Sequence, residues 1–179
     1  MRLALVLALA ATLLAACAST THEVLRTTTT VTVTSVPTAT VSSLPKGPNL
    51  PVSRPNNAIT PGWVETSDAN AVCSSALKQR VRVDKLTAEE VYASYGLQRP
   101  LAPNPPYELD YLVPLTLGGS TLKANIWPAS TTGIGYDEKQ QLASKLRSLV
   151  CQGKLPLLNV QKKLESDWYS LWLRYVYTQ

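Results

Sequence analysis

The chain has 179 residues, of which 45% are apolar and 16% are charged, a composition that excludes a uniformly disordered protein. All twelve Trp and Tyr residues lie at or after Trp63, and six of the thirteen prolines lie at or before Pro61. The foldable part is therefore about residues 62–179, too short for a multidomain enzyme, a doubly wound nucleotide-binding fold of normal size or a repeat array. Residues 62–179 carry 13 Lys or Arg and 11 Asp or Glu, so charge leaves the partner undecided.

The N-terminus has the pattern of a secretory signal. Met1-Arg2 is followed by an apolar run from Leu3 to Leu14 and then by Ala15-Ala16-Cys17. The run is shorter than the roughly 20 residues of a membrane-spanning helix. Leu14-Ala15-Ala16-Cys17 also resembles the bacterial lipobox, which predicts a signal over 1–16 and a lipid on Cys17. The lipid would hold the protein on the outer face of a bacterial membrane. The alternative is a buried apolar helix with a chance cysteine.

Residues 17–61 are expected to form a disordered, lipid-anchored tether. Residues 18–61 contain eleven Thr, five Ser and six Pro and no aromatic residue. The alternation of Thr and Val over 30–34 leaves an edge strand as the alternative reading.

Residues 62–179 are predicted to form a mostly helical α+β domain. Thr87-Ala88-Glu89-Glu90 indicates a capping box that opens a helix through about Tyr95. A β-rich run from Tyr107 to Leu115, a Gly118-Gly119 turn and a return strand over Lys123–Trp127 predict one small hairpin. Two amphipathic helices follow. The first begins at about Asp137, and its apolar stripe holds Leu142, Leu146, Leu149 and Val150. The second has Pro156 near its first turn, and its apolar stripe holds Val160, Leu164, Trp168, Leu171, Trp172 and Tyr175.

The cysteine count favours one disulfide. Three cysteines are odd for an exported protein, and if Cys17 carries lipid then Cys73 and Cys151 remain as a pair. Two free buried thiols are the alternative.

The segment from Tyr107 to Pro128 reads YELDYLVPLTLGGSTLKANIWP and is the most informative part of the chain. It resembles the core of HNH (ββα-metal) nucleases, in particular a group of small exported bacterial proteins with a YE-x-DHLIPLELGG…NLWPE block. The resemblance extends to Cys73 upstream and, downstream, to Lys139, to Val150-Cys151-Gln152-Gly153 and to the helix of Gln161 and Asp167-Trp168. It implies a small ββα-metal fold in which both cysteines match those of the family.

The resemblance also implies a chemistry. Hydrolysis of a phosphodiester uses a divalent cation, Mg²⁺ or Mn²⁺, and a general base with a pKa near 7. In the family an acidic residue contributes to metal binding, the next residue, histidine, is the base, and an asparagine positions that base. Asp110 matches the acidic residue and Asn125 the asparagine, and Asp137 is a further candidate metal ligand.

This sequence departs from the family at the base. Tyr111 stands at the histidine position, and the single histidine of the chain, His22, lies in the tether. Tyrosine has a pKa of about 10, so its use as a base near pH 7 costs roughly 4 kcal/mol. Gln140 and Ala143 also stand where the family often has acidic residues. A packed strand aromatic is the alternative reading of Tyr111, and an exposed acid and a turn amide without metal are the alternative reading of Asp110 and Asn125.

Three hypotheses follow. The first is an exported, lipid-anchored protein with a degenerate HNH-like domain that binds nucleic acid or an envelope component. The second is a working metal-dependent endonuclease with Asp110, Asn125 and Asp137 at the metal. The third is a structural lipoprotein of the cell envelope. The basic residues Arg80, Arg82, Lys162 and Lys163 are interpreted as solvated charges, with a phosphate-facing patch as the alternative.

Overall fold

The computed structural model describes residues 47–74, 81–101 and 105–178. These residues belong to one compact unit, Val41–Gln179. The expected signal over 1–16, the lipidation site Cys17 and the Thr/Val run over 30–34 lie outside the described residues.

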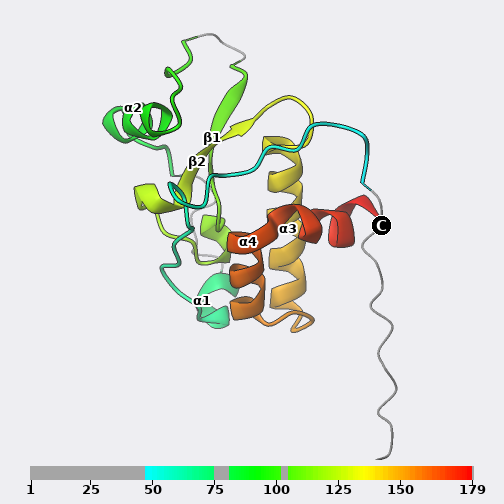
Figure 1. Ribbon diagram of the computed structural model, residues 1–179. Helices are drawn as coiled ribbons and strands as arrows, with labels where there is room; N and C mark the ends of the chain where they lie inside the picture. The colour runs from blue at the N-terminus through cyan, green and yellow to red at the C-terminus, as the bar shows by residue number, and fades with distance from the viewer. Residues whose placement is uncertain (1–46, 75–80, 102–104, 179) are drawn as a thin grey trace, which may run out of the picture. The chain divides into compact units, whose positions relative to one another are not determined.

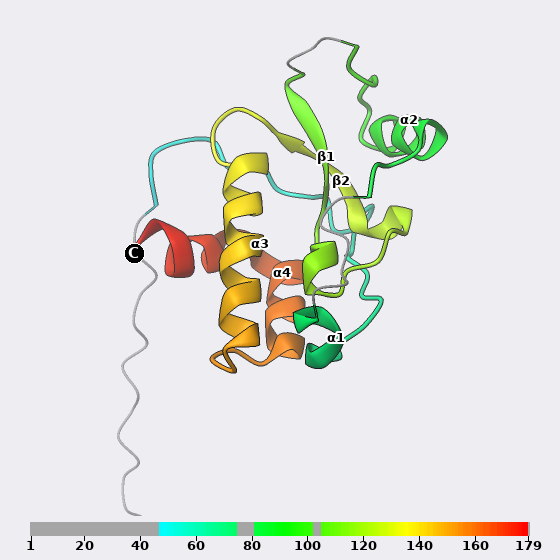
Figure 2. The same cartoon turned by 180° about the vertical axis from the view of Figure 1, so that it is seen from behind.

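A two-stranded sheet and a helix follow one another along the chain. Strand β1 (Tyr107–Tyr111) pairs antiparallel with β2 (Ile126–Ser130), and helix α3 (Tyr136–Cys151) runs beside them (Figures 1 and 2). The predicted hairpin is present, but its strands are placed differently. β1 ends at Tyr111 because the chain turns at Pro114 into the 3₁₀ helix η1 (Leu115–Leu117), and β2 starts after a second 3₁₀ turn, η2 (Lys123–Asn125).

Helices α3 and α4 (Leu157–Trp172) form most of the core. Pro156 is the N-cap of α4, as its missing N–H favours. The predicted apolar stripe of α4 is confirmed, except that Tyr175 is only partly buried and lies in the following helical turn η3 (Leu173–Tyr177). Trp127 of β2 is fully buried and its ring centroid lies 6.5 Å from that of Trp168. The sheet and both long helices therefore share one core.

Asp167 interrupts the helical backbone of α4. Its φ of −165° and ψ of 74° are not helical, and its carboxylate accepts a hydrogen bond from the backbone N–H of Ser170 at 3.2 Å. The Ser170 hydroxyl also hydrogen-bonds to this carboxylate. Asp167 thus acts as an N-cap for the last helical segment, a position that favours Asp.

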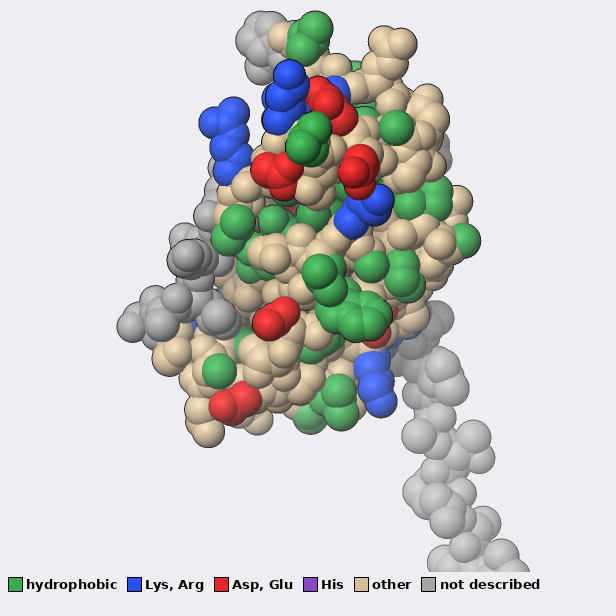
Figure 3. All heavy atoms as spheres, turned by 90° about the vertical axis from the view of Figure 1, so that its left-hand side faces the viewer, with side chains coloured by type: hydrophobic (Ala, Val, Ile, Leu, Met, Phe, Trp, Pro, Cys, Tyr) green, Lys and Arg blue, Asp and Glu red, His purple; other side chains and the backbone are tan. Residues whose placement is uncertain are grey.

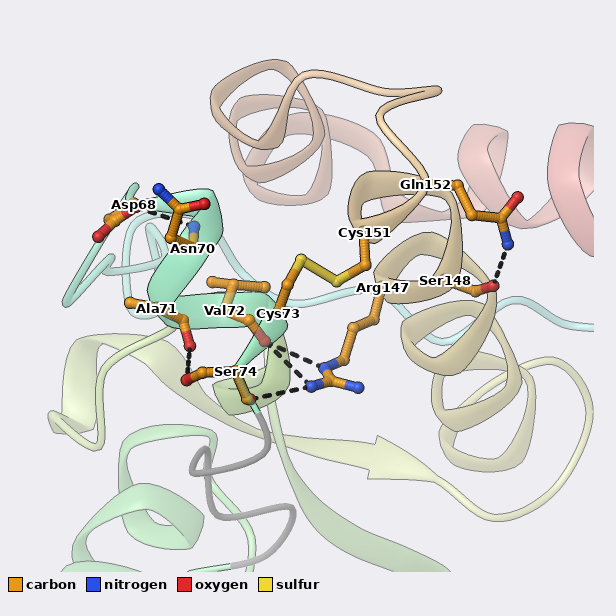
Figure 4. The surroundings of a disulfide bond; sticks show 10 residues. All are labelled: Asp68, Asn70, Ala71, Val72, Cys73, Ser74, Arg147, Ser148, Cys151 and Gln152. Carbon is orange, nitrogen blue, oxygen red and sulfur yellow. Dashed lines mark hydrogen bonds between the residues drawn. A yellow bond between two sulfur atoms is a disulfide. The ribbon is translucent and has the colours of Figure 1, made fainter.

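A disulfide joins the short helix α1 (Ala69–Cys73) to the end of α3. Cys73 and Cys151 are bonded with their Cα atoms 5.4 Å apart, which confirms the predicted pair (Figure 4). Beside the bond, the Arg147 guanidinium donates to the carbonyl oxygens of Val72 at 3.1 Å and Ser74 at 3.3 Å. The bridge and Arg147 therefore fix the same helix end to α3.

The helix predicted at residues 87–95 is α2 (Lys85–Ser94), and its cap differs from the prediction. Asp84 is the N-cap and accepts a hydrogen bond from the Thr87 backbone N–H at 3.0 Å. Thr87 therefore lies in the first turn, and the capping-box reading is wrong.

The boundary predicted between tether and domain at residue 61 is also wrong, because residues 47–66 are docked on the domain. We call this segment the N-terminal strap, and Figures 1 and 2 show it (cyan to green) crossing from the side of η3 to the sheet. The Ser53 backbone N–H donates to the Ile134 carbonyl oxygen at 2.8 Å. The buried Thr60 hydroxyl donates to the Ile126 carbonyl oxygen at 3.0 Å. Hydrogen bonds to distant backbone groups order this Pro-rich stretch, so composition alone did not indicate it.

Candidate functional site

Asp110 is the one buried residue of β1, with 6% of its surface exposed. It lies opposite Trp127 in the sheet register, and its side chain meets α3. The side-chain amide of Gln140 donates a 2.8 Å hydrogen bond to Asp110 Oδ1. A charged carboxylate is thus held inside the ββα arrangement rather than on a solvent-facing strand, so the reading of Asp110 as an exposed strand acid is wrong.

Lys139, the neighbour of Gln140 on α3, is fully buried. Its ammonium donates to the carbonyl oxygens of Tyr111 at 3.1 Å and Leu112 at 2.8 Å, and it lies 3.7 Å from Asp110 Oδ2. The carbonyl groups of the last residue of β1 and of the residue after it therefore receive hydrogen bonds from a side chain. The same ammonium supplies the counter-charge of the buried carboxylate.

Burial governs the ionisation of this pair. Desolvation raises the pKa of the Asp110 carboxyl above its ordinary value, and the Lys139 ammonium and the Gln140 amide act in the opposite direction. Desolvation lowers the pKa of Lys139, and the Asp110 carboxylate opposes that change. Asp110 Oδ2 has no hydrogen-bond partner within the described parts of the chain. The pair is therefore a costly one, held mainly by the bonds that each member makes to other groups.

Tyr111, at the position of the family's base, is partly buried and donates its hydroxyl to the Val81 carbonyl oxygen at 3.2 Å. Burial, and then the charge of Asp110, raise the pKa of the phenol. A general base needs the opposite change, because a higher pKa leaves less phenolate at neutral pH. The site thus strengthens the chemical objection to Tyr111 as a base.

Asn125 is fully buried at the end of η2, and its amide is occupied by backbone groups. Its Oδ1 accepts from the N–H of Val113 at 2.8 Å and of Trp63 at 3.3 Å. Its Nδ2 donates to the carbonyl oxygens of Val113 at 2.9 Å and Ser120 at 2.8 Å. These four bonds use the whole capacity of the amide. These contacts agree with the alternative reading of Asn125 as a turn amide, and Asn125 holds the loop between the strands.

Asp110, Asn125 and Asp137 do not together form the ligand set that the divalent metal implied by the resemblance would need. Asp110 is already neutralised by Lys139, the oxygen of Asn125 has two backbone donors, and Asp137 is exposed in the first turn of α3. Among the described residues, no group of three His, Cys, Asp or Glu side chains is placed to share a metal ion. Of the predicted site residues, Asp110 and Tyr111 lie beside Gln140, whereas Asn125 bonds to the backbone of the loop and Asp137 is exposed on α3.

Two cavities open beside Asp110, Tyr111 and Gln140, which line both of them. One has a volume of about 580 Å³ and extends toward α2, and the other has about 450 Å³ and extends along α3 past Ala143 to Arg147. The positions at which the sequence departs from the family, Tyr111, Gln140 and Ala143, therefore surround one space. Volumes of this size are typical of small-molecule sites.

Three structural partners of the site were not singled out for their roles from the sequence. The resemblance includes Lys139 and Gln161 but gives them no role, and Gln140 stands out only because the family often has an acidic residue at its position. Gln161 on α4 donates to the carbonyl oxygens of Thr66 and Leu117, both at 2.8 Å. A polar residue on the apolar face of a predicted helix is the signal that identifies both Lys139 and Gln161.

Comparisons with known proteins add no relative: no family model, no curated protein and no solved structure matches the chain. None of the helices in the described ranges is long and apolar enough to cross a membrane.

Proposed function

We propose that the protein is an exported, lipid-anchored binding protein whose domain is related to HNH nucleases and has lost their chemistry. Its ligand would be nucleic acid or a component of the cell envelope. The order of two antiparallel strands and a helix, the Gly-Gly turn between the strands and the disulfide support the relationship. The carrying observation is Tyr111, which stands at the position of the family's base and donates its hydroxyl to the Val81 carbonyl oxygen.

The absence of a competent base supports the same proposal. Tyr111 would have to ionise about three pKa units below its ordinary value, at a cost of roughly 4 kcal/mol, and its surroundings raise that cost. The single histidine of the sequence is His22, outside the described residues.

A nicking assay tests the loss of catalysis. Purified protein is incubated with supercoiled plasmid and Mg²⁺ or Mn²⁺ at neutral pH, and nicked circles are counted. We expect negligible nicking by the wild type. Tyr111→His places an imidazole beside Asp110, and Tyr107→His, four residues earlier on β1, is the matched control. Metal-dependent nicking that appears in the first variant alone and disappears on adding Asp110→Ala identifies the base as the main loss.

One observation favours the alternative of a working nuclease. Asp110 Oδ2 is buried and accepts no hydrogen bond from a described residue, and a metal ion would satisfy it. Robust nicking by the wild type that Asp110→Ala abolishes would establish that alternative and refute the proposal. If neither the wild type nor Tyr111→His nicks DNA and neither binds Mn²⁺, the loss of activity extends beyond the base to the positions of Gln140 and Ala143.

The proposed anchor has its own test. Cys17→Ala should release the protein from the membrane fraction or leave it unprocessed, whereas Ser19→Ala should behave as the wild type. Membrane partition and maturation unchanged in Cys17→Ala would remove the lipid anchor from the proposal and leave the domain's role untouched.

A further inference from the structure

The larger cavity beside Asp110 is lined by two arginines, two acidic residues and four tyrosines. It has a volume of about 580 Å³ and is bounded by the stretch before α2, by α2 itself, by Arg99 and by β1. Arg82 and Arg99 line it from two separate stretches of chain. Within the described ranges neither guanidinium makes a hydrogen bond or an ion pair, so both remain available to a ligand.

The acids of the cavity do not cancel these charges. Glu108 is exposed and forms no ion pair with a described residue. Asp110 is compensated by Lys139, whose ammonium lies 3.7 Å away. With two guanidinium groups and one free carboxylate, the cavity has a net charge of about +1 near neutral pH. It therefore suits a ligand with one or two negative charges.

Two of the four tyrosines that line the cavity are held by hydrogen bonds of their hydroxyl groups. The Tyr92 hydroxyl donates to the Tyr107 carbonyl oxygen at 3.3 Å, and the Tyr111 hydroxyl donates to the Val81 carbonyl oxygen at 3.2 Å. Because both hydroxyl groups are engaged with backbone, the rings present their faces and edges in set positions. Fixed aromatic walls bind a flat or sugar ring with little loss of side-chain freedom.

We propose that this cavity binds a small organic anion: a ring that packs on the tyrosines and carries a carboxylate or phosphate held by Arg82 and Arg99. Guanidinium groups bind both anions through paired hydrogen bonds. This inference rests on the proposed function, since it requires that the site bind rather than cleave.

A long polyanion is a poorer match. Binding a nucleic-acid strand requires several phosphate contacts along a basic surface. Residues 62–179 carry an excess of two positive charges, 13 against 11. On the face seen in Figure 3, basic and acidic side chains are interspersed and form no basic track.

The test measures binding of phenyl phosphate and benzoate by titration calorimetry with the full protein. Inorganic phosphate and benzyl alcohol provide the anion and the ring separately. We expect saturable binding of at least one ring-bearing anion, weakened about tenfold by either Arg82→Gln or Arg99→Gln and further by both changes together. Arg174→Gln, an exposed arginine on η3, is the matched control and should bind as the wild type.

Three results would overturn the inference. The first is that neither ring-bearing anion binds saturably. The second is that Arg174→Gln weakens anion binding as much as Arg82→Gln or Arg99→Gln does. The third is that a single-stranded oligonucleotide binds far more tightly and that its binding depends on the same two arginines. The nicking assay is run on the same preparation. Nicking by the wild type refutes the proposed function, whereas missing anion binding in a protein that does not nick refutes this inference alone.

Discussion

Replacing Lys139 by methionine should be among the most destabilising single changes in the domain. The substitution keeps the length and the burial of the side chain but removes the ammonium that neutralises Asp110 and bonds to the carbonyl oxygens of Tyr111 and Leu112. Breaking a buried pair by removing one partner costs about 3–5 kcal/mol, because the other charge is left uncompensated. The two carbonyl groups that lose their donor place Lys139→Met toward the upper end of that range.

A double variant separates the charge from the lost hydrogen bonds. Asp110→Asn in the Lys139→Met background removes the uncompensated charge while its side-chain oxygen can still accept from Gln140. It should therefore recover about half of the loss. Lys145→Met, on the same helix, should change stability by less than about 0.5 kcal/mol. The free energy of unfolding is measured by urea titration. A Lys139→Met protein as stable as the wild type, or no recovery in the double variant, would refute the role assigned to the ammonium.

The cost of Lys139→Met should also depend on pH. Without the ammonium, burial raises the pKa of Asp110 further above the unfolded value of about 3.9. A carboxyl with a raised pKa in the folded state favours folding most below its unfolded pKa, and this contribution is lost as pH rises through the folded pKa. The difference from the wild type should therefore be smaller at about pH 4 than at about pH 8. The same urea titrations at the two pH values check the sign.

Three further predictions concern the scaffold. Cys73→Ser should lower the free energy of unfolding by about 4–5 kcal/mol, because the native bridge closes a loop with a sequence separation of 78 residues. Calorimetry measures this loss, and thiol labelling of the unreduced wild type should be negligible. Asn125→Ala should cost about 3–5 kcal/mol in urea titration, since four backbone groups lose their partner. Arg54→Gln should cost less than about 1 kcal/mol, because its pair with Asp167 is half exposed, whereas Asp167→Ala should cost about 1–2 kcal/mol through the lost N-cap. A larger loss for Arg54→Gln than for Asp167→Ala would contradict the capping role.

The regular elements were predictable where the sequence has a clear period. The apolar spacing of residues 142–150 and 160–172 predicted α3 and α4, and both stripes are buried except for Leu149, which is partly exposed. The strand ends were predicted less well, because β-branched and apolar residues continue past Tyr111 although the backbone leaves the sheet. The strap was missed for a related reason: its ordering comes from hydrogen bonds to residues far along the chain, such as Ile126 and Ile134, which local composition does not encode.

The burial of Asp110 and the hydrogen bonds of Asp110 and Asn125 were not predictable from the sequence. The resemblance identified Asp110 and Tyr111, and the structure places them together against α3. The helical period places Lys139 on the apolar face with Leu142 and Leu146, but its pairing with Asp110 depends on which face of α3 meets β1, and the sequence does not indicate this. The four hydrogen bonds of the Asn125 amide depend on the path of the loop between the strands. The sequence of that loop has no periodicity from which its path could be predicted.

The loop between β1 and β2 is held by buried polar side chains that are separate from the groups facing the cavities. This irregular segment is largely buried, so its backbone groups need partners beyond those that the strap gives to Gly118 and Ser120. Asn125, Lys139 and Gln161 supply them, bonding to backbone groups of Tyr111, Leu112, Val113, Leu117 and Ser120. These three side chains are therefore required for folding whether or not the site performs chemistry. Tyr111 and Gln140 face the cavities, where a replacement leaves the loop's bonds in place. Substitutions at such positions should therefore change the lining of the cavities without unfolding the domain.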